Sequence, residues 1–452
     1  MIPVVTPEEM KAIDQAASEP TEVLVHRAGG AVARVALAMM GGAYGRRVAV
    51  VAGKGNNGAD GRDAADRLRR RRARVDVVDA ADAPSRLEGY DLVVDAAYGT
   101  GFHGGYEAPD PGGAAVLAVD IPSGVNGLTG EAADGAVRAD VTVTFAALKP
   151  GLLLSPGVEH AGVVEVADIG LDPSSAGAGL VEGDDVAAWL PERPREAHKW
   201  MSAVYVVAGS PGMMGAAHLT SQAALRAGAG MVRLGSPGAD PHSFEIGEVV
   251  GRPLPLPGWQ DHVPEDAERA RALIIGPGLG REERTGEAVR EVLARTPLPA
   301  IVDADGLFAL GDAAVAAEVT RGRDQPTVLT PHEGEFARLA GSRPGPDRLG
   351  AVRDLARLTG AIVLLKGSTT VVAEPGGRVL LSAAGGPNLA TAGTGDVLSG
   401  VVGAFLAQGL DPAHAAAAAA WVHGTAAHLG WRRGLVAGDL LDLLPAVLSE
   451  LA

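Results

Sequence analysis

The sequence contains no cysteine among its 452 residues, which excludes disulfides, thiolate nucleophiles and zinc centres built on thiolates. Lysine is almost as scarce, since arginine supplies nearly all of the 39 basic residues. Where a composition favours arginine so strongly, each remaining lysine is a candidate for chemistry that needs a compact ammonium group. The lysines are Lys11, Lys54, Lys149, Lys199 and Lys366.

The sequence also lacks a net positive charge and long hydrophobic runs. The formal net charge of -16 opposes binding to the phosphate backbone of a nucleic acid. The longest apolar run, Ala415 to Val422, is far shorter than the roughly 20 residues that span a bilayer. The N-terminal residues MIPVVTPEEMKAIDQ show no basic start followed by an apolar stretch. We expect a soluble, cytoplasmic homo-oligomer that acts on small molecules and binds neither nucleic acid nor membrane.

The length and the hydrophobic pattern predict two α/β domains. Short apolar runs such as RRVAVVAG, DLVVDAA and DVTVTF alternate with helical patterns, which is typical of buried parallel strands. The alternation breaks between Gly170 and Lys199, where proline, glycine, serine and charged residues indicate a linker. The predicted domains are residues 1–177, a Rossmann-like three-layer αβα domain with a parallel sheet, and residues 178–452, a second α/β domain.

A glycine-rich segment, VAVVAGKGNNGADG, follows the first long buried strand. Gly53, Gly55 and Gly58 have the GxGxxG spacing of a dinucleotide-binding turn, which is a weak signal when it stands alone. Asn56 and Asn57 fill the turn, and their amides are suited to bind an ion or a polar substrate. The alternative is that both asparagines only satisfy backbone groups of the turn.

Polar groups also follow three further predicted strands. Asp95 precedes the GTG sequence at Gly99 to Gly101, Asp120 stands in AVDIPSG with Ser123, and Lys149 follows VTVTF. Because parallel sheets bind ligands outside the carboxyl ends of their strands, we expect these groups to lie near the asparagine loop. A carboxylate and an ammonium group that face one substrate can serve as an acid and base pair.

Together, GNNGADG, DAAYGTG, AVDIPSG and the lysine after the last strand resemble the NAD(P)H-hydrate epimerase family over most of residues 1–170. The resemblance implies epimerisation of NADHX and NADPHX, the hydrated cofactors, at C6 of the ring, with Asp120 and Lys149 as the acid and base. It implies a potassium ion held by Asn57, Asp95 and Ser123. Implied substrate contacts are Asn56, Asn57, Gly58, Ala59, Asp60, Gly99, Thr100, Gly101 and Asp120.

The second predicted domain carries its strongest signal in GGPNLATAGTGDVLSG, residues 385–400. Gly393, Thr394 and Gly395 can form an anion-binding turn at the start of a helix, where free N–H groups favour a phosphate. Asp396 beside such a turn is suited to take a proton from a hydroxyl that attacks a phosphoryl group. The alternative is that Asp396 caps the helix.

Further motifs end other strands of this domain. LLKGSTTVV supplies a cation, a glycine and hydroxyls suited to a nucleotide, and GPGLG, DADG and TPHEGE would line the same rim. The P-loop pattern GxxxxGK[ST] does not occur in the sequence, which argues against a P-loop enzyme.

These motifs, with GSPGMMGAAHLTSQAALRAGAG, resemble the ADP- or ATP-dependent NAD(P)H-hydrate dehydratases of ribokinase-like fold over most of residues 180–452. The resemblance implies that ADP or ATP, with Mg²⁺, phosphorylates the C6 hydroxyl of S-NAD(P)HX with help from Asp396. Phosphate then leaves and NAD(P)H is restored. Implied hydrate contacts are Ala216, Gly278, His332 and Asp396, and implied nucleotide contacts are Lys366, Gly367, Ser368, Thr369, Thr370 and Gly395.

Three other functions remain open from the residues. GTGD and a nucleotide site would also suit a ribokinase-like small-molecule kinase whose N-terminal domain is inactive or only binds. An N-terminal half that lost its activity would be a binding or scaffold domain. The GxGxxG spacing alone would suit an NAD-dependent dehydrogenase. The N-terminal motifs argue against the kinase, because a kinase has no use for a hydrate-binding partner domain.

Overall fold

The computed structural model describes residues 1–102, 104–244 and 247–451, and the chain divides into two compact units. One unit comprises Ile2–Ala178, and the other comprises Gly179–Ala452 together with Met1. Each unit has its own buried apolar core and its own parallel strands, so the predicted α/β class is confirmed.

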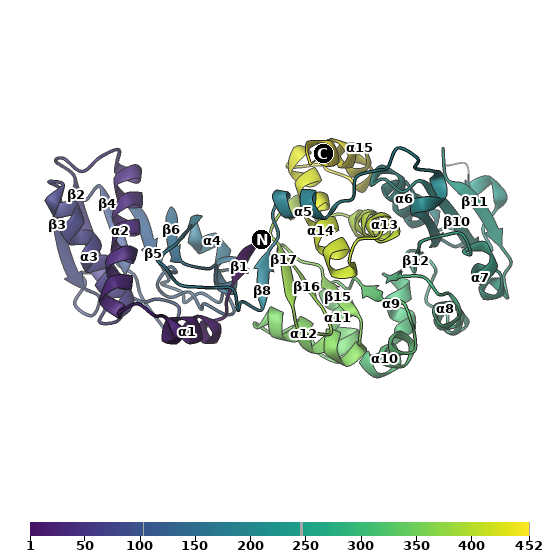
Figure 1. Ribbon diagram of the computed structural model, residues 1–452, viewed down its shortest axis with the longest axis horizontal. Coiled ribbons are helices and arrows are strands. Elements are labelled where there is room, and N and C mark those ends of the chain that lie inside the picture. The colour runs from purple at the N-terminus through teal and green to yellow at the C-terminus, as the bar shows by residue number, and fades with distance from the viewer. Residues whose placement is uncertain (103, 245–246, 452) are drawn as a thin grey trace. The chain divides into compact units, whose positions relative to one another are not determined.

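The first unit contains a six-stranded parallel sheet in the order β3-β2-β4-β5-β6-β7 (Figure 1). Because β3 and β4 lie on opposite sides of β2, the strand order reverses between β2 and β4. The loops at such a reversal are where open α/β sheets bind their ligands. The strands are β1 (Ile2–Val4), which is outside this sheet, β2 (Arg47–Ala52), β3 (Arg74–Asp79), β4 (Leu92–Ala96), β5 (Ala115–Val119), β6 (Val141–Phe145) and β7 (Val163–Ala167).

The helices of this unit are α1 (Pro7–Ala16), α2 (Thr21–Met40), α3 (Asn56–Arg70) and α4 (Val158–Ala161). By length and composition alone α2 could cross a membrane, with a mean hydropathy of 1.3. It packs, however, against α3 and against strands of its own sheet, and this packing accounts for its apolar residues. Alternate residues of β2 point to opposite faces, Val48 and Val50 into the core under α2 and α3, and Val51 into a smaller cluster formed largely by loops.

The glycine spacing after β2 has a steric cause. A Cβ atom at Gly58 would lie 1.9 Å from the carbonyl oxygen of Gly53, and one at Gly53 would lie 2.0 Å from the carbonyl oxygen of Ala97. These two positions therefore accept only glycine, because α3 starts directly against the ends of β2 and β4. The close start of α3 brings the asparagine loop to the point where the strand order reverses.

The sheet of the second unit runs in the order β8-β17-β16-β15-β14-β13-β12-β9-β10-β11 within this unit. Strands β9 to β15 are parallel, and β16 and β17 add an antiparallel hairpin next to β15. The order reverses between β9 and β12. The strands are β8 (Ala178–Leu180), β9 (Ala203–Val207), β10 (Met231–Pro237), β11 (Val250–Leu254), β12 (Ala272–Ile275), β13 (Ala300–Val302), β14 (Thr327–Leu329), β15 (Ile362–Leu365), β16 (Thr370–Ala373) and β17 (Val379–Ser382).

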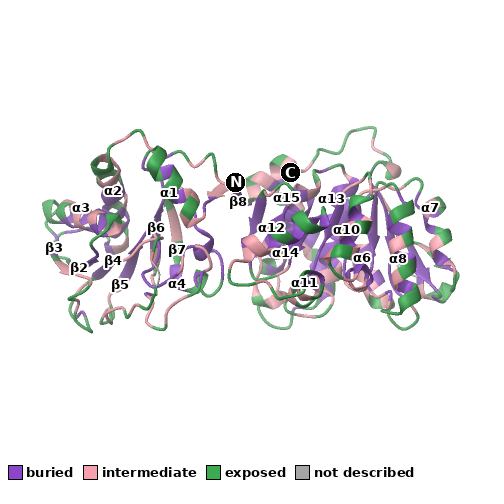
Figure 2. Ribbon diagram, turned by 90° about the horizontal axis from the view of Figure 1, so that it is seen from below, coloured by how far each residue is buried: buried purple, intermediate pink, exposed green. Residues whose placement is uncertain are grey.

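Helices cover both faces of this sheet, whose strands are mostly buried (Figure 2). On one face α6, α13 and α14 pack against the strands, and on the other α12 packs against β15 and β16. The helices are α5 (Gly183–Trp189), α6 (Met214–Arg226), α7 (Val263–Asp266), α8 (Glu283–Arg295), α9 (Asp305–Leu310), α10 (Ala313–Arg321), α11 (Glu333–Ala340), α12 (Arg348–Thr359), α13 (Thr394–Ala407), α14 (Pro412–Leu429) and α15 (Ala437–Glu450).

Candidate active sites

A cavity of about 1100 Å³ opens in the first unit at the loops after β2 and β4. It lies where the strand order reverses, as expected for an open α/β sheet. Gly58 and Ala59 lie in α3 but outside its lining, and Asp95 and Ser123 are buried. The residues expected at this site that do line the cavity are Asn56, Asn57, Asp60, Gly99, Thr100, Gly101, Asp120 and Lys149.

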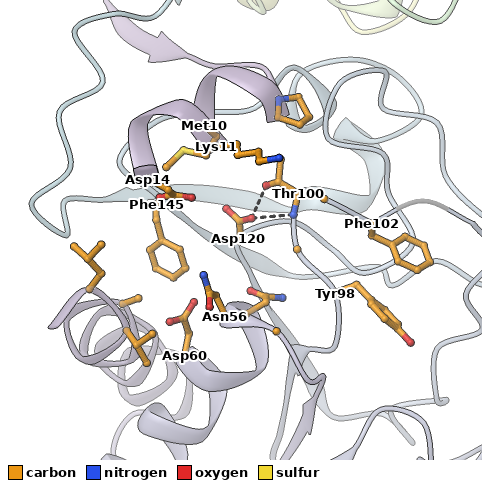
Figure 3. A pocket seen from close by; sticks show the side chains of 18 of the residues that line it. Met10, Lys11, Asp14, Asn56, Asp60, Tyr98, Thr100, Phe102, Asp120 and Phe145 are labelled. Atoms are coloured by element: carbon orange, nitrogen blue, oxygen red, sulfur yellow. Dashed lines mark hydrogen bonds between the residues drawn. The ribbon is translucent and has the colours of Figure 1, made fainter. Parts of the chain in front are cut away.

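Asp120 and Lys149 form a tight ion pair in the wall of the cavity. The Lys149 ammonium donates to Asp120 Oδ1 at 2.6 Å, to Thr144 Oγ1 at 2.8 Å and to the Phe145 carbonyl oxygen at 3.3 Å. Only 1% of the Lys149 side chain is exposed, whereas 16% of the Asp120 side chain is exposed. Figure 3 shows the Asp120 carboxylate facing the cavity while Thr100 donates to it through its backbone N–H and its hydroxyl.

Burial alone would raise the pKa of the Asp120 carboxyl, but the Lys149 charge and the Thr100 hydrogen bonds hold it below its usual value. Asp120 also has a φ of 67°, in the left-handed region that few residues other than glycine adopt. This conformation turns the carboxylate under the Thr100 loop. The pair is therefore saturated by protein contacts, and it is better suited to hold a fixed charge than to exchange protons.

Asp60 and Asp14 are two more acids at the same cavity. Burial raises the pKa of Asp60 to about 8, and the charges of Asp120, Asp63 and Asp14 raise it further. Burial and Asp120 also raise the pKa of Asp14. Figure 3 shows both carboxyl groups around the same space as Asp120, with Phe145 beside them.

Asp14 was missed by the sequence analysis, because its helix precedes every recognisable motif. The usable signal is helical spacing. Asp14 stands four residues after the buried Met10, so both lie on the face of α1 that borders the cavity, although the Asp14 side chain is itself exposed.

Of the three residues expected to hold potassium, Asn57 lines the cavity, whereas Asp95 and Ser123 are buried outside its lining. Asp95 accepts from the Ser123 hydroxyl at 2.7 Å and from the Ser123 backbone N–H at 2.8 Å. Burial raises the pKa of Asp95 to about 6 despite these hydrogen bonds. Both amide atoms of Asn57 are buried and, within the described residues, have no hydrogen-bond partner. An amide carbonyl without a partner is suited to a hard cation or to a polar substrate group.

The second unit also has a lysine–aspartate ion pair, at the ends of β13 and β15, but there the other member of the pair is buried. The Lys366 ammonium contacts Asp303 Oδ1 at 2.6 Å, and the Ser399 hydroxyl donates to Asp303 Oδ2 at 2.6 Å. Here the carboxylate is the buried partner, with 1% of its side chain exposed against 20% for Lys366. Asp303 belongs to the DADG motif, but its partnership with Lys366 could not be read from the sequence because 63 positions separate the two residues.

Helix α13 begins beside this ion pair. Its N-cap is Gly393 at a φ of 91°, with no side-chain cap, so Asp396 lies in the first turn and does not cap the helix. A Cβ atom at Gly395 would lie 3.2 Å from Lys366 Nζ, which places the ammonium group against the first turn. Free N–H groups and a cation at one helix start form a site suited to phosphate.

Burial raises the pKa of Asp396 to about 6, with further contributions from Asp303, Asp305 and Glu335. The Lys366 charge acts in the opposite direction. A carboxylate with a pKa near neutrality is suited to accept a proton from a hydroxyl group.

The other residues expected to contact the hydrate or the nucleotide are Ala216, Gly278, His332 and the segment from Lys366 to Thr370. A Cβ atom at Gly278 would lie 3.3 Å from the Ala216 side chain, so these two residues adjoin. His332 is the N-cap of α11, where Nδ1 accepts from the backbone N–H of Gly334 at 2.9 Å. Its side chain remains 61% exposed at the strand rim. Lys366 to Thr369 form the turn between β15 and β16, and Thr370 is the first residue of β16; Thr369 is buried, whereas Gly367 and Ser368 are exposed.

Two protein families match the chain. Residues 204–447 match the family described as NAD(P)H-hydrate dehydratase. Residues 21–88 and 78–151 match the family described as YjeF-related protein N-terminus. The two matches fall in the second and the first unit respectively.

Several relatives extend over both units. The protein named bifunctional NAD(P)H-hydrate repair enzyme Nnr from Moorella thermoacetica is 40% identical over 80% of this chain and 73% of its own length. The protein of that name from Mycobacterium tuberculosis is 44% identical over 72% of this chain and 67% of its own. Its counterpart from Thermofilum pendens is 35% identical over 98% of this chain and 95% of its own.

Solved structures also match part of the chain. The ADP/ATP-dependent NAD(P)H-hydrate dehydratase from Bacillus subtilis, co-crystallised with ATP and Mg²⁺, gives a TM-score of 0.51 at 31% identity, covering 60% of this chain and 98% of its own. A ribokinase-like superfamily protein from Enterococcus faecalis gives a TM-score of 0.53 at 22% identity, covering 61% of this chain and 97% of its own, which bears on the fold alone. The predicted ribokinase-like fold is confirmed.

Proposed function

The chain belongs to the family of bifunctional NAD(P)H-hydrate repair enzymes, and from this premise we propose how its residues divide the two reactions. The epimerase domain is residues 1–177 and the dehydratase domain is residues 178–452, a division supported by the two compact units. The first interconverts the R and S forms of NADHX and NADPHX at C6. The second dehydrates the S form to NADH or NADPH at the expense of ADP or ATP. Matches across both domains disfavour a small-molecule kinase with an accessory domain.

In the epimerase domain, the hydrated ring binds in the cavity between the asparagine loop and the Thr100 loop. The negative end of the Asp120 and Lys149 pair faces the ring and stabilises positive charge that develops on it. Asn56 and the backbone of Gly99 to Gly101 contact its polar substituents. The support for this placement is that these groups line one cavity at the reversal of strand order.

Potassium in this domain would be held by the Asn57 amide oxygen with Asp95 and Ser123. The unpartnered Asn57 amide and the raised pKa of Asp95 fit a nearby cation, because a cation would satisfy the amide and favour the ionised carboxyl. A bound potassium ion supplies a fixed positive charge that orients the substrate.

In the dehydratase domain, Asp396 takes the proton of the C6 hydroxyl as that oxygen attacks the terminal phosphoryl group of the nucleotide. The new ester group then leaves C6 as phosphate, which is a far better leaving group than hydroxide, while C5 loses a proton to solvent and the C5–C6 double bond of NAD(P)H forms. Lys366 and the first turn of α13 hold the transferring phosphoryl group. Ala216, Gly278 and His332 contact the hydrate, and the turn from Gly367 to Thr370 contacts the nucleotide.

Mg²⁺ in this domain would be held by the Glu335 carboxylate together with the nucleotide phosphates. Within the residues that the structure describes, no group of three or more histidine or acidic side chains could hold a metal alone. Mg²⁺ commonly binds through one or two carboxylates and substrate phosphates, so this donor set fits. The pKa of Glu335 is raised by burial and by Asp303, and a cation beside it would relieve both effects.

The observation that carries this function is the placement of Asp396 and Lys366 at the open start of α13. We would incubate S-NADHX with ADP and Mg²⁺, then with ATP and Mg²⁺, and measure NADH and released phosphate together. The expected result is one phosphate for each NADH formed, and no NADH when the metal is chelated. NADH formation without phosphate release would contradict the phosphorylation route.

A further inference from the structure

Among the acids that line the epimerase cavity, Asp60 is buried without a polar partner, whereas Asp120 is paired with Lys149, and Glu8 and Asp14 are exposed. It lies in the first two turns of α3 with 7% of its surface exposed, and it lines the cavity. Neither a hydrogen bond nor an ion pair to its carboxyl group occurs within the described residues. Its neighbour on the same helix, Asp63, is by contrast paired with Arg67 and His26.

The charges that face Asp60 come from several elements. Asp63 on α3, Asp14 on α1 and Asp120 after β5 all disfavour a negative charge on it. The cation of Lys149 is held by Asp120, Thr144 and Phe145, so it does not contact Asp60. Lys11 and Lys54 line the same cavity, and the part of α2 that lines it is Thr21, Leu24, Val25 and Ala28, which carry no charge.

These surroundings keep Asp60 protonated at neutral pH, since burial raises its pKa to about 8. A neutral carboxyl group is a proton donor, whereas the Asp120 carboxylate is a permanent acceptor. The cavity therefore offers a substrate one acid that is free to donate and one fixed negative charge.

We propose that Asp60 is the proton carrier of the epimerase reaction and that Asp120 with Lys149 only stabilises charge. This inference rests on the proposed epimerase function. The Asp60 carboxyl group gives its proton to the C6 hydroxyl, the C6–O bond breaks, and water leaves. The lone pair of N1 forms a double bond to C6, which leaves a planar iminium cation.

The iminium cation lies beside the carboxylates of Asp60 and Asp120, which stabilise its positive charge. Water then attacks C6 from the opposite face, and N1 regains its lone pair. The extra proton of the added water returns to Asp60. The substrate keeps its composition, Asp60 ends in its starting state, and the configuration at C6 has inverted.

The test is the variant Asp60→Asn in the full chain, because asparagine keeps the size of the protonated acid but has no carboxyl proton to donate. Epimerisation is followed from pure R-NADHX by chromatography of the two epimers, and dehydration of S-NADHX is followed in the same preparation. We expect epimerisation to fall about 10²- to 10⁴-fold and dehydration to stay unchanged. Asp60→Glu should restore part of the rate.

Asp66→Asn is the matched control, since Asp66 lies on the same helix with 62% of its side chain exposed. The pH profile supplies a second readout. The wild-type epimerisation rate should fall as the pH rises through about 8, and Asp60→Asn should lose this dependence. An Asp60→Asn rate within threefold of wild type, or an unchanged alkaline limb, would overturn the proposal. A wild-type chain that interconverts the epimers no faster than buffer would instead overturn the epimerase function itself, and this inference with it.

Discussion

The two units hold the same ion pair in opposite orientations. In the first unit the lysine is the buried member, since Lys149 is 1% exposed and Asp120 is 16% exposed. In the second unit the carboxylate is the buried member, since Asp303 is 1% exposed and Lys366 is 20% exposed. Both pairs have a separation of 2.6 Å and stand at the carboxyl ends of parallel strands.

The orientation of the pair decides which charge each site presents. The first cavity receives a negative charge, which suits a ring that becomes cationic when a hydroxyl group leaves. The second site receives a positive charge at a helix start, which suits a phosphate. A buried partner of opposite sign fixes each presented charge in place. The two sites thus share one structural device with its polarity reversed.

The largest effect that separates the two sites is expected from Asp396→Asn. Dehydration of S-NADHX should fall about 10²- to 10⁴-fold, because the amide cannot accept the hydroxyl proton. Epimerisation should be unchanged, since the substitution leaves the first cavity intact. Rates of both reactions in one preparation measure this. Loss of both would show that the substitution acts through folding, and loss of neither would remove Asp396 from the chemistry.

Replacing each of the two lysines with methionine, and comparing the loss in the free energy of unfolding, tests the opposite orientations of the two ion pairs. Lys366→Met leaves the buried Asp303 carboxylate uncompensated, and we expect a loss of about 3–5 kcal/mol in the free energy of unfolding. Lys149→Met should cost less, about 1–3 kcal/mol, because Asp120 is more exposed and keeps its hydrogen bonds to Thr100.

All five tryptophans lie in the second unit, so their fluorescence during urea unfolding reports the Lys366→Met effect. Hydrogen exchange of β2 to β6 reports the Lys149→Met effect. Equal losses in the free energy of unfolding would contradict the prediction that a more exposed carboxylate costs less when its lysine partner is removed.

Asp60→Asn should stabilise the first unit above neutral pH. The pKa of Asp60 is raised in the folded state to about 8, so wild type loses stability as the pH rises from the unfolded pKa through this value. At about 1.4 kcal/mol per pKa unit, the variant should gain a few kcal/mol at pH values near 9 and almost nothing near pH 4. Hydrogen exchange of β2 to β6 at several pH values measures the difference. A gain that is the same at every pH would contradict it.

The smallest predicted difference is in how the rates of the two reactions depend on pH. Dehydration should slow as the pH falls through about 6, because Asp396 must be ionised to accept a proton. Epimerisation should slow as the pH rises through about 8, because Asp60 must be protonated. Each rate should fall about tenfold per pH unit once the pH has passed the pKa in the direction that inactivates the carboxyl group. Both rates slowing in the same direction would contradict the assignment of one base and one acid.

Much of the fold and part of the sites could be predicted from local pattern. The short apolar runs marked the strands, and the glycine spacing marked a turn whose close packing at Gly53 and Gly58 leaves no room for a side chain. The scarcity of lysine was a useful guide, since Lys149 and Lys366 anchor the two ion pairs. Lys11, which belongs to no motif, also lines the cavity, whereas Lys199 instead faces the ring of Trp200.

What could not be predicted depends on contacts between distant residues. The sequence predicted that Asp120 and Lys149 lie close together. It did not predict the additional hydrogen bonds that Thr100 makes to Asp120 and Thr144 makes to Lys149. It named Asp60 only as a contact, because the isolation of its carboxyl group exists only in the folded chain. The burial of Asp303 likewise requires β13, β15 and α13 to meet.

The most direct test of two active sites in one chain is complete repair of a mixture of R- and S-NADHX. Near-ultraviolet absorbance of the restored dihydronicotinamide ring is followed with ADP or ATP and Mg²⁺ for wild type, Asp60→Asn and Asp396→Asn. We predict full recovery by wild type, recovery of the S fraction followed only by slow spontaneous conversion for Asp60→Asn, and almost none for Asp396→Asn. Wild-type recovery that stops at the S fraction would contradict a working epimerase, and no recovery with either nucleotide would contradict the dehydratase.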